Sequence, residues 1–520
     1  MSKTWVIGSR GSDLALWQAR FLQDQLKKLG AASEIKIIKT QGDQIQHLSF
    51  DKLEGKGFFT KEIEEALLQQ HIDIAVHSHK DLETAPVEGL AIAAVSYREN
   101  PAELLLIRKE KYDPSRPLGL PENAILGTSS ARRKNQALLF RPDLEIRDLR
   151  GNVPTRVQKL RDGGYDAILL ARAGVDRLNL DLTGLHVEVL DPRHFIPPPA
   201  QGVLAFQVRS DDAEAVALIG QLNQPEVAAC IGVERKVLRM LNGGCRLPLG
   251  VYCEKKENRY HVWASLSEQV DATPQRTYVE ASSTDGLAED ILNRLQTKQN
   301  LRVLVTRELD NDSLLRRLLE AAGCTVTGES FIRFEPVEVR EVPPSDWLFF
   351  SSKNAVKYFL GTVGNPHAAK IAAVGEATAS AIRQLGMEVD FVGDHSDTTV
   401  VAEAFRNIAG KANVLFPGSD ISVRTVQKCF PDDQVTDLVV YRTLDRNDVS
   451  VPEFDAVIFT SPSNVNMFFR HAQLNPQRHR VVVMGITTGK ALEASGFSKY
   501  VRPWSASEEA LADTLLSSYP

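Results

Sequence analysis

The residue best placed to do chemistry is a single cysteine, Cys245, in the run Leu-Asn-Gly-Gly-Cys-Arg-Leu-Pro-Leu-Gly at residues 241–250. The two glycines permit backbone angles that are closed to other residues, and Pro248 fixes the direction in which the chain leaves. A helix pattern runs up to Gly243, so the thiol is expected on a helix-to-strand turn that holds it out. A lone cysteine is more often a small buried hydrophobe, and the rest of the chain decides between the two interpretations.

A second group of reactive side chains follows a buried strand pattern. The strand expected at residues 72–76 delivers His-Ser-His-Lys-Asp-Leu at residues 77–82. Ligands of open α/β sheets bind at the carboxyl ends of strands, so this run is predicted to line a site. A solvated loop is the alternative interpretation.

Arginines recur at strand ends and helix starts. Arg132 and Arg133 follow the helix cap at Ser129 and Ser130, where the helix dipole favours acids, so an anionic guest is expected to supply the negative charge. Guanidinium groups bind carboxylates through paired hydrogen bonds and stay charged, and the predicted ligand is therefore a polycarboxylate. Any one arginine is as easily a surface charge or an ion-pair member. The set is Arg10, Arg132, Arg133, Arg150, Arg156 and Arg177.

Length and composition limit the class of protein. A chain of 520 residues is too long for one core and predicts roughly three to five units. No apolar run approaches the ~20 residues that cross a bilayer, and the start lacks a signal peptide's apolar core, so a cytoplasmic protein without a membrane partner is expected. A net charge of -6 argues against nucleic-acid binding. Five scattered cysteines predict neither a disulfide framework nor a metal site.

Alternating strand and helix patterns predict an α/β fold for the first part of the chain. A strand pattern at residues 203–208 follows a proline-rich crossover and is expected to rejoin the first sheet. The predicted division is therefore residues 1–98 with 200–220, residues 99–199, and an α+β domain at residues 221–298 that carries Cys245.

After a polar linker at residues 296–300 the chain repeats itself. Segments that begin at residues 302, 350 and 374 match segments that begin at residues 413, 459 and 484, at offsets of 111, 109 and 110 residues. A duplicated, two-lobed α/β unit is predicted, with one lobe at residues 301–336 and 442–520 and the other at residues 337–441. No set of Asp, His and Cys in this part assembles into a nucleophile and base, so any catalysis there would work by holding the substrate in shape.

The first part resembles porphobilinogen deaminase, also called hydroxymethylbilane synthase, over residues 1 to about 298. The resemblance rests on ordered motifs: Gly-Ser-Arg at 8–10, Gly-Lys-Gly-Phe-Phe at 55–59, His-Ser with Lys-Asp at 77–81, Gly-Thr-Ser-Ser with Arg-Arg at 127–133, Asp-Leu-Arg-Gly-Asn-Val at 148–153, and Asn-Gly-Gly-Cys at 242–245. It implies two α/β lobes like those of periplasmic binding proteins, plus the small α+β domain. Residues 301–520 resemble uroporphyrinogen-III synthase through a more diffuse signature, Phe-Thr-Ser-Pro at 459–462, two Val/Met-Gly-x-x-Thr turns, and Val-Tyr-Arg at 440–442.

The first resemblance implies that Cys245 holds a dipyrromethane cofactor through a thioether. Four porphobilinogen molecules would then be joined with loss of ammonia and released as hydroxymethylbilane by a transferase activity. Asp81 would hold pyrrole N–H groups and stabilise the positive charge that develops. The cofactor would be held by Lys80, Ser129, Arg132, Arg133, Arg150 and Arg156, and the substrate by Arg10, Lys56, Ser78 and Arg177.

The second resemblance implies a lyase activity that closes hydroxymethylbilane with inversion of its last ring. Tyr441 would assist loss of the terminal hydroxyl. Substrate carboxylates would be gripped by Ser351, Thr378, Thr460, Ser461, Thr487 and Thr488. Together the two resemblances imply a monomeric, multifunctional enzyme of tetrapyrrole, and hence heme and porphyrin, biosynthesis.

Two alternatives stay open at the level of the sequence. One is a deaminase with an inactive C-terminal half, and the other is a non-enzymatic carboxylate-binding module of the periplasmic-receptor type. The chain also departs from the deaminase pattern: His79 stands where Met is common, Glu83 where a proline is common, and Gln207 where Glu is expected. The first two departures bear on the shape and pH response of the loop that carries Asp81.

Overall fold

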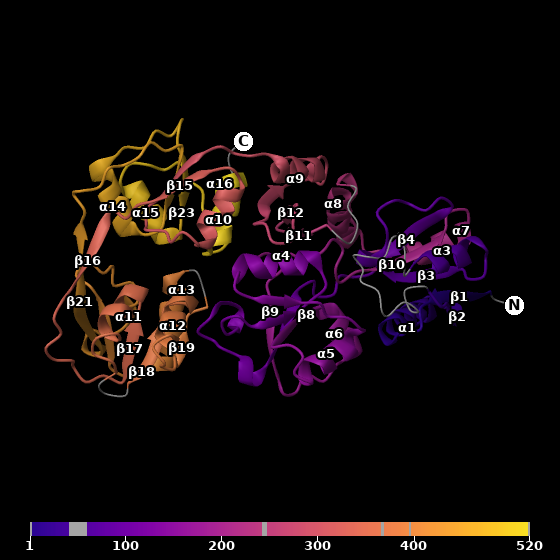
Figure 1. The fold of residues 1–520 in the computed structure, drawn as a ribbon, viewed down its shortest axis with the longest axis horizontal. Helices are drawn as coiled ribbons and strands as arrows, with labels where there is room; N and C mark the ends of the chain where they lie inside the picture. Colours follow the sequence, from indigo (N-terminus) through magenta and orange to yellow (C-terminus); the bar gives the residue numbers. More distant parts are fainter. Residues whose placement is uncertain (1–2, 41–59, 242–246, 366–368, 395–396, 518–520) are drawn as a thin grey trace. The chain divides into compact units, whose positions relative to one another are not determined.

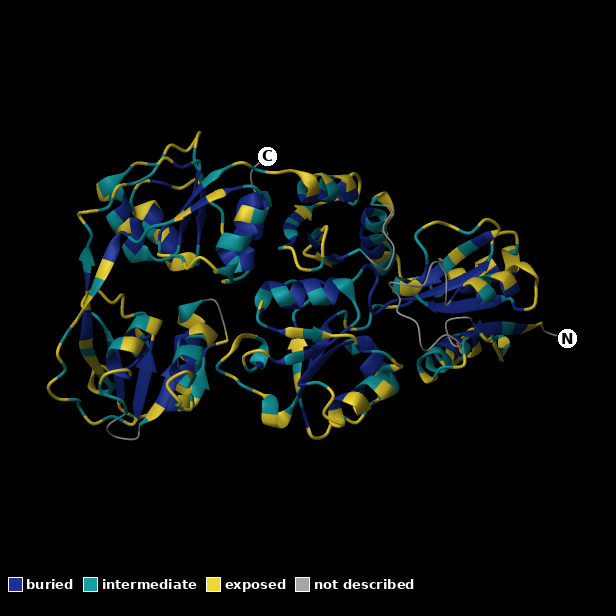
Figure 2. Ribbon diagram, viewed as in Figure 1, coloured by how far each residue is buried: buried dark blue, intermediate teal, exposed yellow. Residues whose placement is uncertain are grey.

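The computed structural model describes residues 3–40, 60–241, 247–365, 369–394 and 397–517 (Figure 1). The chain forms two compact units, Met1–Tyr112 with Leu120–Thr297, and Asp113–Gly119 with Lys298–Pro520. The central strands of the sheets are largely buried, the edge strands are more exposed, and most helices have one buried and one exposed face (Figure 2). The α/β class predicted from the sequence is confirmed.

The first sheet of the first unit has the order β2-β1-β3-β10-β4. Its strands are β1 (Thr4–Ser9), β2 (Ala32–Ile37), β3 (Ile74–Ser78), β4 (Leu90–Val95) and β10 (Leu204–Arg209), with helices α1 (Asp13–Lys28), α3 (Lys61–Leu68) and α7 (Ala213–Gly220). As predicted, β10 returns to this sheet, where it runs antiparallel to β3 and β4. Because β1 and β3 are parallel, their carboxyl ends bring Arg10 and the turn after Ser78 to one edge.

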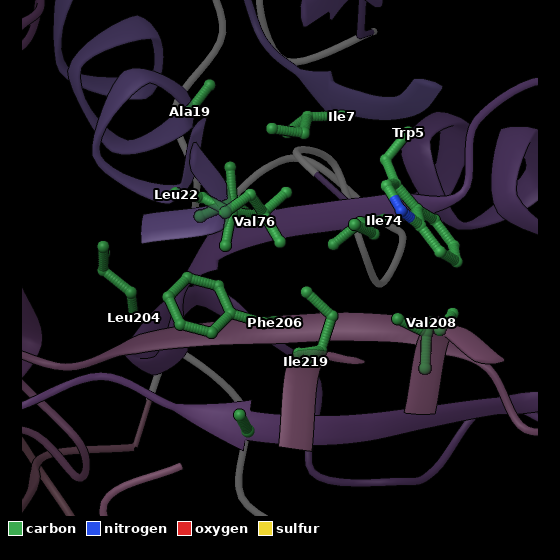
Figure 3. Close-up of a cluster of buried hydrophobic side chains, with 13 residues drawn as sticks. Trp5, Ile7, Ala19, Leu22, Ile74, Val76, Leu204, Phe206, Val208 and Ile219 are labelled. Carbon is green, nitrogen blue, oxygen red and sulfur yellow. The ribbon is translucent and has the colours of Figure 1, made fainter. Parts of the chain in front are cut away.

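The interior of this sheet follows the alternation of its strands. Trp5 and Ile7 of β1, and Ile74 and Val76 of β3, point toward one side and pack with Leu22 of α1 (Figure 3). Helix α1 begins at a serine cap, Ser12, whose hydroxyl accepts a hydrogen bond from the backbone of Ala15 at 3.4 Å. Local signals thus fix both the strand face and the helix start that frame Arg10.

The second sheet has the order β7-β6-β8-β5-β9. Its strands are β5 (Glu103–Arg108), β6 (Ile125–Gly127), β7 (Glu145–Arg147), β8 (Ala167–Ala171) and β9 (Leu185–Leu190), with helices α4 (Ala131–Phe140), α5 (Val153–Arg161) and α6 (Arg172–Leu178). Strands β6, β7 and β8 are parallel, so the loops that carry the predicted arginines leave the same edge.

A third, antiparallel sheet completes the first unit. It consists of β11 (Leu249–Lys256), β12 (Arg259–Leu266) and β13 (Gln275–Ala281), covered by α8 (Pro225–Met240) and α9 (Leu287–Gln296). Helix α8 ends next to the run that contains Cys245, which lies outside the described residues.

The second unit contains two sheets. The first, in the order β15-β14-β22-β23, consists of β14 (Arg302–Val305), β15 (Thr325–Gly328), β22 (Ala456–Phe459) and β23 (Arg480–Val483), with helices α10 (Leu314–Ala321), α14 (Pro462–His471), α15 (Ile486–Ala494) and α16 (Glu508–Ser517). The second, in the order β16-β21-β20-β17-β18-β19, consists of β16 (Ile332–Pro336), β17 (Trp347–Phe350), β18 (Lys370–Ala373), β19 (Phe391–Val392), β20 (Val414–Ser419) and β21 (Val435–Asp445), with helices α11 (Lys353–Phe359), α12 (Glu376–Arg383) and α13 (Thr398–Ala409). Strand β16 pairs with β21 and so belongs to the second sheet, while the limits of the lobes stay predictions.

Within the described ranges, no helix combines the length and the hydropathy needed to span a membrane. The same residues contain no group of three or more His, Cys, Asp or Glu side chains suited to a metal ion.

Candidate active sites

The turn after β3 carries the predicted Lys80 and Asp81. It is a single turn of 3-10 helix at His79–Asp81, held by a hydrogen bond from the His79 backbone N–H to the Val203 carbonyl at 2.9 Å. Lys80 Nζ donates to Gln201 Oε1 at 3.2 Å. The Asp81 side chain is exposed and forms no hydrogen bond with the described residues, so its carboxylate remains available for a guest.

Charged residues of the first and second sheets act on Lys80. Burial lowers the pKa of Lys80, Arg133 and Arg132 lower it further, and Asp81 and Glu103 act in the opposite direction. The predicted lysine of the first sheet and the predicted arginines of the second therefore share one electrostatic environment.

Arg132 and Arg133 face a buried carboxylate that the sequence argument did not name. Glu103, at the start of β5, accepts from Arg132 Nη2 at 2.5 Å and from Arg133 Nη2 at 2.7 Å. Burial alone would raise the pKa of Glu103, but Arg133 and Arg132 hold it at about 2. The negative charge that the helix start was expected to take from a guest comes, in part, from the protein itself.

The same three residues fit a group that bears carboxylates. Two guanidinium charges face one carboxylate, which leaves an excess of positive charge. The Nε of Arg133 is buried without a hydrogen-bond acceptor among the described residues. Because an unsatisfied buried donor is costly, a carboxylate guest would stabilise this arrangement.

Arg156 and Arg150 extend the positive charge. Arg156 Nε donates to the Gly151 carbonyl at 2.7 Å, and Gly151 has a φ of 116°, a conformation that favours glycine. Burial lowers the pKa of Arg156 to about 10, with repulsion from Arg133 and Arg150 acting in the same direction. These guanidinium groups are close enough to disfavour one another, and a polyanion would relieve that repulsion.

Ser129 has a structural partner. Its hydroxyl donates to the Leu149 carbonyl at 3.0 Å and accepts from the Leu149 N–H at 3.0 Å. It therefore clamps the end of β6 to the loop that carries Arg150, and its place in cofactor binding stays a prediction.

Arg177, Arg10 and Ser78 lie at the edges of the first sheet and α6. Arg177 Nη2 donates to the Gly202 carbonyl at 2.7 Å, and its guanidinium lies 5.5 Å from the ring centre of Trp17. Burial lowers the pKa of Arg177. Ser78 accepts from Gln18 Nε2 at 2.8 Å, and Arg10 is half-buried directly after β1.

Two predicted residues, Lys56 and Cys245, lie outside the described residues. The four described cysteines are free, and Cys230 and Cys253 are buried in the core between α8 and β11.

Glu103 and Gln201 were not predicted from the sequence. Two sequence signals could have identified them. Glu103 is a lone acid before the apolar run at 104–107, and Gln201 is a lone glutamine at the end of the proline-rich crossover.

Two of the three departures from the deaminase pattern, His79 and Gln207, are buried, and Glu83 is half-buried. The ring of His79 has no hydrogen-bond partner at either nitrogen among the described residues, and burial, Arg235 and His77 lower its pKa to about 3. His77 Nε2 lies 3.1 Å from Gln207 Oε1, and burial lowers the pKa of His77 to about 4. At physiological pH the lowered pKa keeps both rings neutral and makes each a weaker proton acceptor than an exposed histidine.

The second unit contains a cavity of about 1090 Å³, lined by strands of its second sheet and by segments that follow strands of its first sheet. Of the predicted residues, Ser351, Tyr441 and Ser461 line it. Ser461 also caps α14, since its Oγ accepts from the Asn464 N–H at 3.3 Å. The cavity is large enough for a ligand of several rings.

Tyr441 is buried at the wall of this cavity. Its hydroxyl lies 3.4 Å from Ser352 Oγ. Burial raises the pKa of Tyr441, Asp420 and Tyr358 act in the same direction, and Ser352 opposes them. The raised pKa keeps the phenol protonated at physiological pH, so its hydroxyl can donate a hydrogen bond.

Four predicted hydroxyls do not line the cavity. Thr378 and Thr488 are buried, and Thr487 is exposed. Thr460 Oγ1 donates to the Thr306 carbonyl at 3.4 Å, and its N–H donates to Thr306 Oγ1 at 3.3 Å. A contact between these residues and a substrate stays a prediction.

Strand β21 places two further polar residues on the cavity wall. Tyr441, Thr443 and Asp445 alternate along the strand, so they share one face, and all three line the cavity. Asp445 accepts from His471 Nε2 at 3.2 Å and from Arg470 Nη1 at 3.1 Å. The alternation around Tyr441 was the sequence signal that could have identified Thr443 and Asp445.

Comparisons with known protein families match both parts of the chain. The family described as "Porphobilinogen deaminase, dipyromethane cofactor binding domain" matches residues 5–217, and the one described as "Uroporphyrinogen-III synthase HemD" matches residues 315–513.

Curated relatives match the first part. A porphobilinogen deaminase of Streptococcus sanguinis is 38% identical over 297 residues, which is 56% of this chain and 95% of that protein. Those of Clostridioides difficile and Helicobacter hepaticus are 39% and 43% identical, over 59% and 61% of this chain and 98% and 95% of theirs.

Solved structures show a fainter likeness. A uroporphyrinogen-III synthetase of Helicobacter pylori aligns with a TM-score of 0.33 and 19% identity, over 41% of this chain and 98% of that one. At that score the likeness carries no argument about function.

Proposed function

The chain belongs to the porphobilinogen deaminase family and carries a C-terminal segment that matches uroporphyrinogen-III synthase, and from this premise we propose which residues serve each of the two reactions. It is a fusion of two enzymes of tetrapyrrole biosynthesis. The first part joins four porphobilinogen molecules with loss of ammonia, and the second closes hydroxymethylbilane to uroporphyrinogen III.

The family description names a dipyrromethane cofactor, and the described residues fit one. When bound, that group supplies the pyrrole carbon on which the chain is extended. We assign its thioether attachment to Cys245. Arg132, Arg133 and Arg156 would hold its acetate and propionate groups, because they share an excess of buried positive charge, and Arg150 adds to the repulsion on Arg156.

The single observation that carries the deaminase assignment is the meeting of Lys80 and Asp81 with Arg132 and Arg133. The exposed carboxylate of Asp81 can accept pyrrole N–H groups and stabilise positive charge as ammonia leaves. Lys80 and these arginines would hold the carboxylates of the cofactor, so the group that stabilises the cation and the groups that bind carboxylates would lie together.

In the second unit, the cavity and Tyr441 carry the assignment. The protonated phenol can donate to the departing hydroxyl of hydroxymethylbilane. Ser351 and Ser461 offer hydroxyls at the same cavity, which would orient the linear tetrapyrrole for closure of its last ring in inverted order.

Three finer features belong to the same proposal. The three sheets of the first unit support two α/β lobes of periplasmic-binding-protein type and a small α+β domain. A monomer and a cytoplasmic location are also proposed, to be tested by sedimentation and by cell fractionation.

A product assay on the full chain tests the proposal. Porphobilinogen is supplied, the uroporphyrinogen formed is oxidised, and its isomers are separated. The type III isomer is expected, because unassisted closure of hydroxymethylbilane gives the symmetric type I isomer. Type I alone would show that the second part is inactive, and no product, with no adduct on Cys245 in an intact mass spectrum, would favour a carboxylate-binding module.

A further inference from the structure

Arg235, on α8, grips the backbone of the turn that carries Asp81. Its Nη1 donates to the carbonyl of His79 at 2.9 Å and to that of Leu82 at 3.3 Å. Its Nη2 donates to the carbonyls of Leu82 at 3.3 Å and Glu83 at 2.6 Å. One guanidinium therefore holds carbonyl groups on both sides of Asp81.

The turn has few other ties. Its internal hydrogen bond, from the Leu82 N–H to the His79 carbonyl, is long at 3.4 Å. The His79 ring has no hydrogen-bond partner among the described residues, and the Asp81 side chain forms no hydrogen bond with them. Outside Arg235, the described residues hold the turn through the hydrogen bond from the His79 N–H to the Val203 carbonyl and the one from Lys80 Nζ to Gln201 Oε1.

The hydrogen bonds from Arg235 are suited to holding the backbone of the turn rigid. No described carboxylate forms an ion pair with Arg235, and its described hydrogen bonds all go to backbone carbonyls. Hydrogen bonds from a charged donor are roughly twice as strong as neutral ones, and the planar guanidinium fixes the angles between the carbonyls it holds.

Helix α8 is itself anchored next to Arg235. Glu234, which is fully buried, accepts from Arg98 Nη1 at 2.6 Å, from the Ala200 N–H at 2.6 Å and from the Cys253 N–H at 2.8 Å. Two adjacent residues thus tie the helix to the crossover before β10, to β11 and to the turn after β3.

We propose that Arg235 is a positioning residue for Asp81, which it holds in place from the helix of the third sheet. The inference rests on the role assigned to Asp81 above. The Asp81 carboxylate must stay aligned with each successive substrate molecule, so the backbone of its turn must keep a fixed position. A displacement of a catalytic group by about 1 Å can lower the rate about 100-fold.

The first test is a set of matched variants of the full chain. Arg235→Gln is expected to lower kcat about 100-fold with little change in KM for porphobilinogen, because substrate carboxylates are bound elsewhere. Arg235→Lys, which keeps the charge but loses the fork, is expected to recover part of the rate. Arg239→Gln, an exposed arginine on the same helix, is the control and should keep kcat within about two-fold. An Arg235→Gln variant as fast as the control would overturn the inference.

Backbone hydrogen exchange supplies a readout that does not depend on turnover. Amides of residues 79–83 should exchange faster in Arg235→Gln than in the parent chain, while those in the middle of α8 should keep their protection. Unchanged exchange in the turn would contradict the inference, and so would equal loss of protection throughout α8, because that would show unfolding of the helix.

A double-variant cycle separates this inference from the proposed function. If Arg235 acts through Asp81, the Arg235→Gln change should slow the Asp81→Glu variant far less than it slows the parent chain. Equal factors in both backgrounds would remove Arg235 from the positioning of Asp81. Near-normal turnover by Asp81→Ala would instead overturn the role of Asp81 itself, whatever Arg235 does.

Discussion

Arg133 and Glu103 form a buried ion pair, with Nη2 and Oε2 2.7 Å apart, between the first turn of α4 and the start of β5. Arg132 holds the other oxygen of the same carboxylate. The pair therefore places a cationic site at the edge of the second sheet while part of its charge is already balanced. A buried carboxylate of this kind allows two arginines to stay close together until a polyanion arrives.

Removing the Glu103 carboxylate should lower the free energy of unfolding of the first unit. Glu103→Gln leaves two buried guanidinium groups without their counter-charge, and we expect a loss of about 3–5 kcal/mol in the free energy of unfolding. The midpoint of urea unfolding, followed by a probe in the first unit, measures it. Glu145→Gln, which breaks the exposed pair with Arg147, is the control and should cost no more than about 1 kcal/mol. Equal shifts for both would contradict the prediction.

Stability should fall as the pH drops below about 6.5. The pKa of His77 is lowered to about 4 and that of His79 to about 3, so the folded state keeps both neutral while the unfolded chain takes up protons. The unfolded state then binds more protons, and each histidine should add a slope of up to about 1.4 kcal/mol per pH unit between pH 6.5 and 5. Urea midpoints across that range measure it.

The matched variant for the pH prediction is His79→Met, which removes one of the two buried rings. Its unfolding free energy should vary less steeply between pH 6.5 and 5 than that of the parent chain. Identical slopes would mean that His79 does not titrate differently in the two states.

Tyr441→Phe should change which isomer forms without changing the supply of hydroxymethylbilane. Loss of a proton donor typically costs a factor of about 100 to 10,000, so spontaneous closure should compete and the share of the type I isomer should rise. Isomer ratios from the coupled assay measure it. Tyr500→Phe, whose hydroxyl donates to Glu493 far along the sequence from the cavity residues, should keep the parent ratio. A Tyr441→Phe product that stays wholly type III would remove the phenol from the reaction.

Arg150→Ala should stall the growth of the oligopyrrole. Arg150 contributes to the positive charge around Arg156, and a lengthening chain brings two carboxylates with every unit. Intact mass spectra taken after brief exposure to porphobilinogen should show enzyme that carries one to three added units and little that carries four. Arg161→Ala, on the exposed side of α5, is the control. If the Arg150→Ala variant gives the same mass pattern as the parent chain, Arg150 does not belong to the site.

Much of this protein was determined by signals that act over a few residues. The caps at Ser12, Ser130 and Ser461 each accept a hydrogen bond from a backbone N–H three residues later. The apolar strand before His77 and the return of β10 to the first sheet follow from hydrophobic pattern and chain connectivity in the same way. Such features depend on near neighbours in the sequence, so the α/β class and the edge that bears Lys80 and Asp81 could be derived from it.

Only the tertiary structure decided which groups face one another. Glu103 meets Arg132 and Arg133 across 29 and 30 residues, and Arg235 meets the His79 carbonyl across 156. Thr378 and Thr488 are hydroxyl residues near helix starts, where anions are often bound, yet both are buried and neither lines the cavity of the second unit. Asp445, which was not predicted, does line it. Contacts at such separations depend on how sheets and helices pack, and on which charges that packing removes from water, and neither quantity is encoded in any short run of residues.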